Sequence, residues 1–269
     1  MSLKKYFLFV TTILLVNLSF AGDLYWVGNS GNWNDASHWS NISGGNGGYG
    51  IPTASDNIFI DKNSFTEDGG ITISNTAICK NFNWTPNKTS TLNSAINTQL
   101  TVNGSFTVNS KFENKSFGKT IFSSSQSNEE ITSNGKEFLG NIVFDGSGSW
   151  NLMSFTSVKG SIIFNKGSLN LNNNNIICES FISLSSKKRV LTTPKSFILV
   201  RDSWDFSSTN KLTLNLGSST IFVNNNDNTK IKKGSLSYDI ETPNVQKAGA
   251  LVVSDSSVTC NGFDDGKAI

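Results

Sequence analysis

The segment Val158-Lys159-Gly160-Ser161-Ile162-Ile163-Phe164-Asn165-Lys166-Gly167-Ser168-Leu169 decides the fold class of this chain. It contains the same unit twice, a polar Lys-Gly-Ser turn followed by a strand-like stretch. Ile and Phe favour strands, and the Gly and Ser before them form turns at little conformational cost. The repeated turn and strand therefore predict β structure.

The same kind of stretch recurs on both sides of this segment. Each stretch is short, rich in Val, Ile, Phe or Thr, and bounded by Gly, Asn, Ser or Asp. No long segment has apolar residues at the i, i+3, i+4 and i+7 positions of an amphipathic helix. We therefore expect an all-β protein, with strands at 57–61, 100–102, 106–108, 141–144, 161–164, 212–216 and 220–223.

Some of these stretches also resemble one another across the chain. Ile78-Cys79-Lys80-Asn81-Phe82 parallels Ile177-Cys178-Glu179-Ser180-Phe181. Such self-similarity indicates a solenoid or a multi-stranded sandwich. Apolar runs such as 142–144 and Asn-rich turns at 172–175 and 224–226 favour a right-handed parallel β-helix, whose stacked turns can place Asn side chains in hydrogen-bonded ladders. A β-sandwich is the alternative.

The first 21 residues have the layout of a secretory signal peptide. Lys4 and Lys5 precede an apolar run at 6–20, and Ser19-Phe20-Ala21 offers small residues at the two positions that a signal peptidase reads. The run is shorter than the ~20 residues that span a bilayer, which disfavours a membrane anchor. We expect cleavage near Ala21, and no membrane-spanning segment in the mature chain.

The charge balance of the mature chain excludes several partners. The whole chain has 22 basic and 20 acidic residues, and two of the lysines lie in 1–21, so 20 of each sign remain. A chain without net charge offers no basic field to nucleic acid or anionic lipid. We therefore expect no nucleic-acid partner.

Catalytic and metal-binding residues are scarce. The chain has one histidine, His38, and no Cys/His ligands at workable spacing. Cys79, Cys178 and Cys260 are too few for a disulfide scaffold, so we expect buried free thiols, with a Cys79–Cys178 bridge as the alternative. We expect a protein that is not an enzyme and that needs no cofactor.

A β-helix enzyme acting on polysaccharide is the catalytic alternative. A hydrolase of that shape needs paired carboxylates, and Asp202 and Asp205 could share one turn, although solvated turn acids are the simpler interpretation. A lyase needs cations to neutralise a uronate, and only Arg189 and Arg201 are present as arginines. The oxygens of Glu129-Glu130 or Asp264-Asp265 are candidate ligands for calcium.

Trp26, Trp33 and Trp39 crowd a glycine-rich segment at 22–56. Exposed aromatic faces stack on sugar rings, which makes these three residues candidate ligand-binding residues. We favour the alternative that they close the end of the solenoid, because a solenoid needs a cap over its terminal apolar layer and its unpaired strand edge. The expected organisation is a capping segment at 22–56 and a β-solenoid domain at 57–253.

The opening Tyr25-Trp26-Val27-Gly28-Asn29-Ser30-Gly31-Asn32-Trp33-Asn34-Asp35-Ala36-Ser37-His38-Trp39-Ser40 resembles the Trp-Gly-rich start of large surface proteins from Bacteroidota. Pro52-Thr53-Ala54-Ser55-Asp56-Asn57 follows at the position that this family shows, and the resemblance continues to roughly residue 240. It implies a β-helix that caps a long, exported, adhesin-like chain.

The segment Ser257-Val258-Thr259-Cys260-Asn261-Gly262-Phe263-Asp264-Asp265-Gly266-Lys267-Ala268 is similar to the start of a SprB-type repeat of gliding-motility adhesins. This resemblance implies that 254–269 is the truncated start of a small β-sandwich module, continuous with further repeats, in cargo of type IX secretion. The rest of that module and the sorting domain of such cargo are lacking.

Three functions follow from these observations. The first is a secreted or cell-surface adhesin-like scaffold, non-catalytic, linked to gliding motility and in contact with an extracellular surface or polysaccharide. The second is a secreted β-helix that binds or cleaves carbohydrate. The third is a structural spacer without a ligand.

Overall fold

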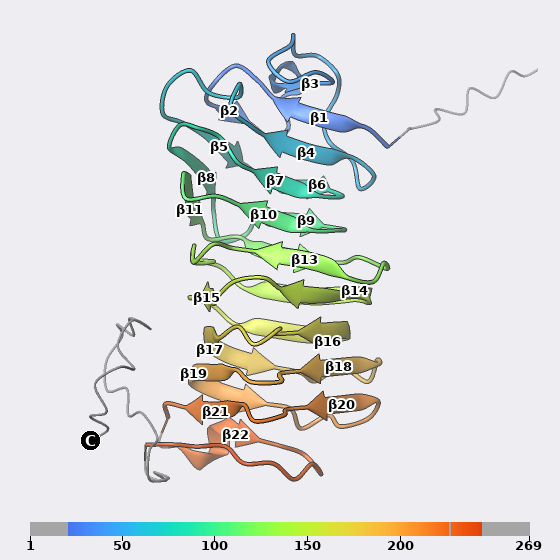
Figure 1. Cartoon of the computed structure of the whole chain (residues 1–269), viewed down its shortest axis with the longest axis vertical. Helices are drawn as coiled ribbons and strands as arrows, with labels where there is room; N and C mark the ends of the chain where they lie inside the picture. The colour runs from blue at the N-terminus through green and yellow to red at the C-terminus, as the bar shows by residue number, and fades with distance from the viewer. Residues whose placement is uncertain (1–20, 226, 244–269) are drawn as a thin grey trace, which may run out of the picture.

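The computed structural model describes residues 21–225 and 227–243, and their strands stack as a parallel β-solenoid of about eight turns (Figure 1). Within these ranges every pairing between strands is parallel except that of β1 with β3. No α-helix occurs there, and two short 3-10 helices complete the elements, η1 (Ala36–His38) and η2 (Asn228–Lys230). The all-β solenoid is confirmed and the sandwich alternative is wrong, because sandwiches are built from antiparallel pairs.

Each turn of the chain passes over three faces. Face A carries the strands that begin a turn, with bounds β1 (Asp23–Trp26), β4 (Asn57–Ile60), β7 (Phe82–Trp84), β10 (Phe106–Val108), β13 (Glu129–Thr132), β18 (Arg189–Thr192) and β20 (Leu212–Asn215). Face B carries the next set, β2 (Gly31–Asn32), β5 (Gly69–Ile73), β8 (Ser90–Ser94), β11 (Phe112–Ser116), β15 (Thr156–Val158) and β21 (Thr220–Val223). Face C completes the turn with β6 (Thr76–Cys79), β9 (Gln99–Val102), β12 (Lys119–Phe122) and β22 (Ile231–Lys232).

Four long strands bend around a corner and serve two faces. The strands β14 (Ile142–Leu152) and β16 (Ile162–Asn170) begin on face C and end on face A of the next turn. The strands β17 (Ile176–Ile182) and β19 (Phe197–Asp205) run from face B to face C. The sequence predicted a turn at 165–168, but the hydrogen-bonded strand continues through it, with Gly167 at φ 89°.

The core consists of side chains that stack in columns from turn to turn. On face A, Ile58, Phe82, Phe106 and Ile131 are in register and almost fully buried. Residues between them along each strand point outward, since successive side chains of a strand alternate between faces. The Phe82 and Phe106 rings stack with centroids 4.8 Å apart. These columns form one apolar core that extends along the whole solenoid.

Asparagine side chains stabilise the corners, as the Asn-rich turns predicted. Asn109, Asn134 and Asn174 each donate a side-chain amide to a backbone carbonyl oxygen of the preceding turn, at 2.9, 3.1 and 2.8 Å. At another corner, Asn225 donates to the carbonyl oxygen of Asp202 at 3.1 Å. The bonds run from side chain to backbone, so buried carbonyl groups at the corners are satisfied.

The structure is continuous across the predicted boundary between the capping segment at 22–56 and the solenoid at 57–253. β1 pairs in parallel with β4, and β2 pairs in parallel with β5, so the segment 22–56 supplies a first, incomplete turn. A short strand, β3 (Trp39–Ser40), folds back antiparallel to β1. The predicted signal peptide, except Ala21, and the segment 254–269 lie outside the described residues, as does the end of the predicted solenoid domain after Pro243.

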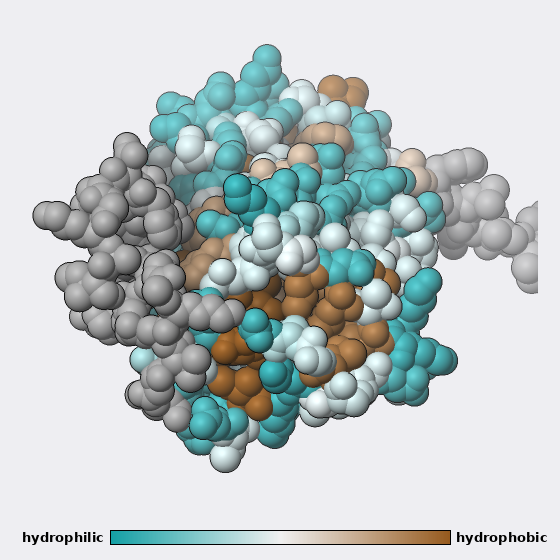
Figure 2. All heavy atoms as spheres, turned by 60° about the horizontal axis from the view of Figure 1, so that its bottom comes forward, coloured by the Kyte–Doolittle hydropathy of each residue, from teal (hydrophilic) through white to brown (hydrophobic). Residues whose placement is uncertain are grey.

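The two ends of the solenoid differ. At the end that carries the C-terminal half, β20 pairs with β18 on one side and with no described strand on the other. Leu212, Leu214 and Leu216 are only partly buried there, as are Ile231 and Tyr238. Figure 2 shows the hydrophobic surface that gathers at this end.

Candidate functional site

Three tryptophans fill the end of the solenoid that carries β1. Trp26, Trp33 and Trp39 have no exposed surface. The Trp39 ring lies edge-on to both others, with centroids 5.1 Å from Trp26 and 5.0 Å from Trp33. Trp39 Nε1 donates to the carbonyl oxygen of Trp33 at 2.8 Å, and Trp26 Nε1 donates to that of Asn29 at 2.6 Å. Below them, Trp33 stacks on Phe82 of the main column.

This burial bears on the prediction that the three tryptophans bind a ligand. A ring that stacks on a sugar must expose one face, and none of the three indoles does. Their arrangement fits the capping alternative, because they cover the apolar layer at the end of the core. Two other aromatic side chains are exposed, Tyr49 of the segment 22–56 and Phe117. In the described chain neither ring stacks on another aromatic residue.

His38 packs within the cap. Its ring stacks flat on Trp26, with centroids 4.6 Å apart and planes within 3°. Its Nδ1 lies 2.7 Å from the carbonyl oxygen of Val27, and a carbonyl can only accept, so the proton is on Nδ1. Gly31 is required beside the ring, because a Cβ there would lie 2.2 Å from Nε2. Within the described chain no hydroxyl or carboxylate is hydrogen-bonded to this ring.

The carboxylates of Asp202 and Asp205 are the pair that sequence reasoning singled out for catalysis. The sequence allowed that they share one turn, and the structure places both on β19, a continuous strand that passes through the corner. Each carboxylate has its own lysine in the following turn, Lys230 at 3.4 Å from Asp202 and Lys232 at 3.4 Å from Asp205. The two acids therefore connect successive turns separately.

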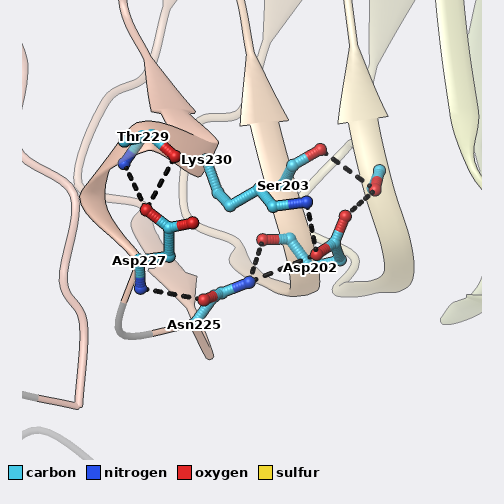
Figure 3. Close-up of polar contacts among 7 residues, drawn as sticks. Asp202, Ser203, Asn225, Asp227, Thr229 and Lys230 are labelled. Atoms are coloured by element: carbon cyan, nitrogen blue, oxygen red, sulfur yellow. Dashed lines mark hydrogen bonds and ion pairs between the residues drawn. The ribbon is translucent and has the colours of Figure 1, made fainter.

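Asp202 is the centre of the larger of these two networks (Figure 3). Its carboxylate accepts from the side-chain amide of Asn225 at 3.2 Å, and Lys230 reaches it from η2. Asp227, at the start of η2, accepts from the backbone and the hydroxyl group of Thr229. These hydrogen bonds from Thr229 lower the pKa of Asp227. Asp202, Asn225, Asp227 and Lys230 thus each have a polar partner inside the protein, and the network fastens the last turn.

The weak calcium candidate Glu129 is also engaged in hydrogen bonds. Its two carboxylate oxygens accept from the hydroxyl groups of Ser105 and Ser124, at 2.6 and 3.0 Å. Glu129 ends a ladder of hydrogen bonds along face A, which links side chains of successive turns to one another or to a backbone amide. Its members are Asp23, Asn57, Asn81, Ser105 and Glu129. Among the described residues no group of three or more His, Cys, Asp or Glu side chains is placed to hold a metal ion. Asp264-Asp265 lies outside them.

Arg189 was a candidate cation for a lyase, and the structure buries it completely. Its guanidinium group donates five hydrogen bonds at a corner, to the carbonyl oxygens of Lys187, Ser183, Ser208 and Asn210 and to the hydroxyl group of Ser183. All five partners belong to the protein, so this cation is not directed at a substrate.

The cysteines follow the prediction of buried free thiols. Cys79 and Cys178 are fully buried, and neither forms a disulfide. Burial raises the pKa of both thiols, because the charged thiolate is disfavoured in the apolar core. Neither thiol is therefore a reactive nucleophile while the core is closed. Cys260 lies outside the described residues.

A shallow polar hollow lies on face B near the capped end. It is lined by glycines, hydroxyl groups and amides, from Ser30, Gly31, Asn32, Gly69, Gly70, Thr72, Thr91 and Asn93. No charged or aromatic side chain contributes to it. It offers hydrogen-bonding groups but no catalytic acid, base or nucleophile.

Comparison with known proteins gives no match to a family model, to a curated protein or to a solved structure. Of the chain that the structure describes, no helix is long and apolar enough to cross a membrane.

Proposed function

We propose that this chain is a non-catalytic β-solenoid scaffold, adhesin-like and displayed outside the cell. The observation that carries the proposal is the difference between the ends of the solenoid. One end is closed by buried tryptophans, and at the other β20 has an edge that pairs with no described strand and leucines that are only partly buried. Such a unit is suited to terminate a stacked structure on one side and to continue it on the other.

The surface of the described chain supports a scaffold over an enzyme. Four of the residues that the sequence offered for catalysis, His38, Asp202, Asp205 and Arg189, are held in contacts within the fold. The signal-peptide pattern at 1–21 and the resemblance to surface proteins of Bacteroidota support export. A link to gliding motility and type IX secretion rests on the SprB-like segment alone.

The location of the native protein tests this proposal. An antibody raised against residues 22–243 would be used to blot intact cells and culture medium, with and without protease added outside the cells. We expect a cell-bound band that disappears with external protease. A band that stays protected until the cells are lysed would contradict display outside the cell.

Carbohydrate binding by the hollow on face B is the second candidate. Its hydroxyl and amide lining favours it, since such groups can hydrogen-bond to a sugar chain. The mature chain would be passed over immobilised polysaccharides, with Asn93→Ala as the matched variant. Retention that Asn93→Ala lowers would support binding at this hollow, whereas equal retention of both chains would place any binding elsewhere.

A further inference from the structure

Asp56 is a buried carboxylate without a basic side chain as partner. Only 7% of the residue is exposed. Its Oδ2 accepts from the backbone N–H of Thr53 at 2.8 Å and from the hydroxyl group of Thr53 at 2.6 Å. Its Oδ1 accepts from the backbone nitrogen of Gly22 at 2.9 Å. In the described chain no lysine, arginine or histidine forms an ion pair with Asp56, and buried carboxylates are costly without a counter-charge.

Gly22 is held at this carboxylate by the sheet itself. Its carbonyl oxygen accepts from the backbone N–H of Asn57 at 2.9 Å, and the next residue, Asp23, is in register with Asn57. The parallel pairing of β1 with β4 therefore fixes the nitrogen of Gly22 next to the residue that precedes β4. This placement does not depend on what is attached to that nitrogen.

We propose that Asp56 is the receptor for the α-amino group of Gly22 that forms when residues 1–21 are removed. The inference rests on the export proposed above. A signal peptidase hydrolyses the peptide bond between Ala21 and Gly22; water supplies the oxygen of the new Ala21 carboxylate and a proton for the new Gly22 amine. An α-amino group has an ordinary pKa of about 7.7–8.0, so at neutral pH it takes up a further proton. The resulting ammonium group lies against Asp56, and an ion pair replaces the amide hydrogen bond.

Cleavage at this bond would strengthen the contact between Gly22 and Asp56 without changing the position of the first turn. A hydrogen bond between two ions is roughly twice as strong as one between neutral groups. The ammonium group also supplies the counter-charge that Asp56 lacks in the uncleaved chain. The surface beside Gly22 is hollowed, with Asn41, Tyr49 and Ile51 along its sides, so the two extra N–H groups of the amine can face water. Removal of the leader thus stabilises the end of the solenoid that the tryptophans close.

Four chains test the inference as a double-mutant cycle. The first is residues 22–269 with a free Gly22 amine, released from a fusion by a protease that leaves no extra residue. The second carries Ala21 preceded by six neutral Gly and Ser residues. In the second chain the amide bond to Asp56 is kept, but the ammonium group is displaced by up to ~20 Å, beyond the Debye length of ~8 Å at physiological salt. The third and fourth chains repeat these two termini with Asp56→Asn.

We expect the free amine to raise the melting temperature by about 3 °C when Asp56 is present, and to leave it unchanged with Asp56→Asn. An equal rise in melting temperature with Asp56 and with Asp56→Asn, or no rise with Asp56, would overturn the inference.

A second measurement needs no Asp56 variant. Acylation of the Gly22 amine, followed by mass spectrometry, should be at least ~10-fold slower in the folded chain than in urea, and equal rates would count against the ion pair.

Sequencing of the native N-terminus separates this inference from the proposed function. A mature chain that begins at Gly22 supports both. An exported chain that begins at another residue overturns the inference and leaves the scaffold proposal standing. A chain that keeps residues 1–21 and stays inside the cell removes the basis of both, whatever the double-mutant cycle shows.

Discussion

The two ends of the solenoid meet the same physical problem in different ways. Any stack of turns must stop, and the last turn then exposes an apolar layer and a row of unpaired backbone groups. At the end that carries β1, Trp26, Trp33 and Trp39 bury that layer completely. At the other end, Leu212 and Leu214 of β20 remain partly exposed.

The contacts that hold the last turns also differ in kind from those of the cap. Near β20, polar links are added to the packed core, through the buried guanidinium group of Arg189 and the ion pairs of Asp202 and Asp205 with lysines. The comparison indicates that tryptophan packing covers one end completely, whereas the other combines directional bonds with an apolar layer that stays partly exposed. Three experiments test this difference between the two ends.

The largest effect is expected from Trp39→Ala at the capped end. This change removes the ring that contacts both other tryptophans and leaves a cavity, so the free energy of unfolding should fall by about 3–5 kcal/mol. Leu214→Ala at the open end is the matched variant. It should cost about 1 kcal/mol, because its side chain is already partly in water. Urea denaturation followed by circular dichroism measures both. If both variants lost the same free energy of unfolding, the apolar layers at the two ends would be equally buried, which contradicts the comparison.

An intermediate effect is expected from Arg189→Met. The change leaves four carbonyl oxygens at a buried corner without this donor, at an expected cost of about 3 kcal/mol. Arg189→Lys keeps the charge but not the planar fork, so its loss should be similar or only slightly smaller. The same denaturation experiment measures both variants. If Arg189→Met were neutral, apolar packing alone would hold the C-terminal turns, and the contrast between the ends would disappear.

The smallest effect is expected from acid. Partial burial alone would raise the pKa of Asp205, but hydrogen bonds from Ser207 and the Lys232 ammonium outweigh burial and lower it. A carboxyl group whose pKa is lowered by folding adds stability above its ordinary value near 3.9, and this stability is lost as pH falls through the lower folded value. The Lys232 side chain is largely exposed, so the loss should not exceed about 1 kcal/mol.

Hydrogen exchange between pH 6 and pH 3, corrected for its intrinsic pH dependence, measures this loss locally. Protection of β22 should fall in acid while that of β9, which carries no acidic residue, stays constant. In the Lys232→Met variant the acid-induced fall should be smaller. A parallel fall in β9 and β22 would show that acid weakens the whole solenoid and not its open end.

Strand positions could be predicted from the sequence because alternation and turn residues are local signals. The stretches at 57–61, 106–108 and 220–223 coincide with β4, β10 and β21 to within a residue. Corners were less predictable. Gly167 and the segment 202–205 look like turns, but in a solenoid a bend can keep its hydrogen bonds to the next turn, so β16 and β19 continue through them.

The roles of individual residues depended on contacts that the sequence does not show. Trp33 follows the two-residue strand β2 and lies outside a regular alternation of apolar and polar residues. The neighbouring sequence therefore could not indicate whether its ring faces the core or water. Arg189 is charged, and only the arrangement of carbonyl groups from two turns explains its burial. The contact between Asp56 and Gly22 joins residues 34 positions apart and exists only because β1 and β4 pair in one register.

The two buried cysteines have a use that goes beyond their place in the core. Cys79 lies near the capped end and Cys178 near the open end, and neither thiol is accessible while its turns are stacked. A thiol reagent can therefore label each site only after that part of the solenoid has opened. In a chain whose Cys260 is replaced by serine, the order in which the two positions are labelled would record the direction in which the molecule unfolds.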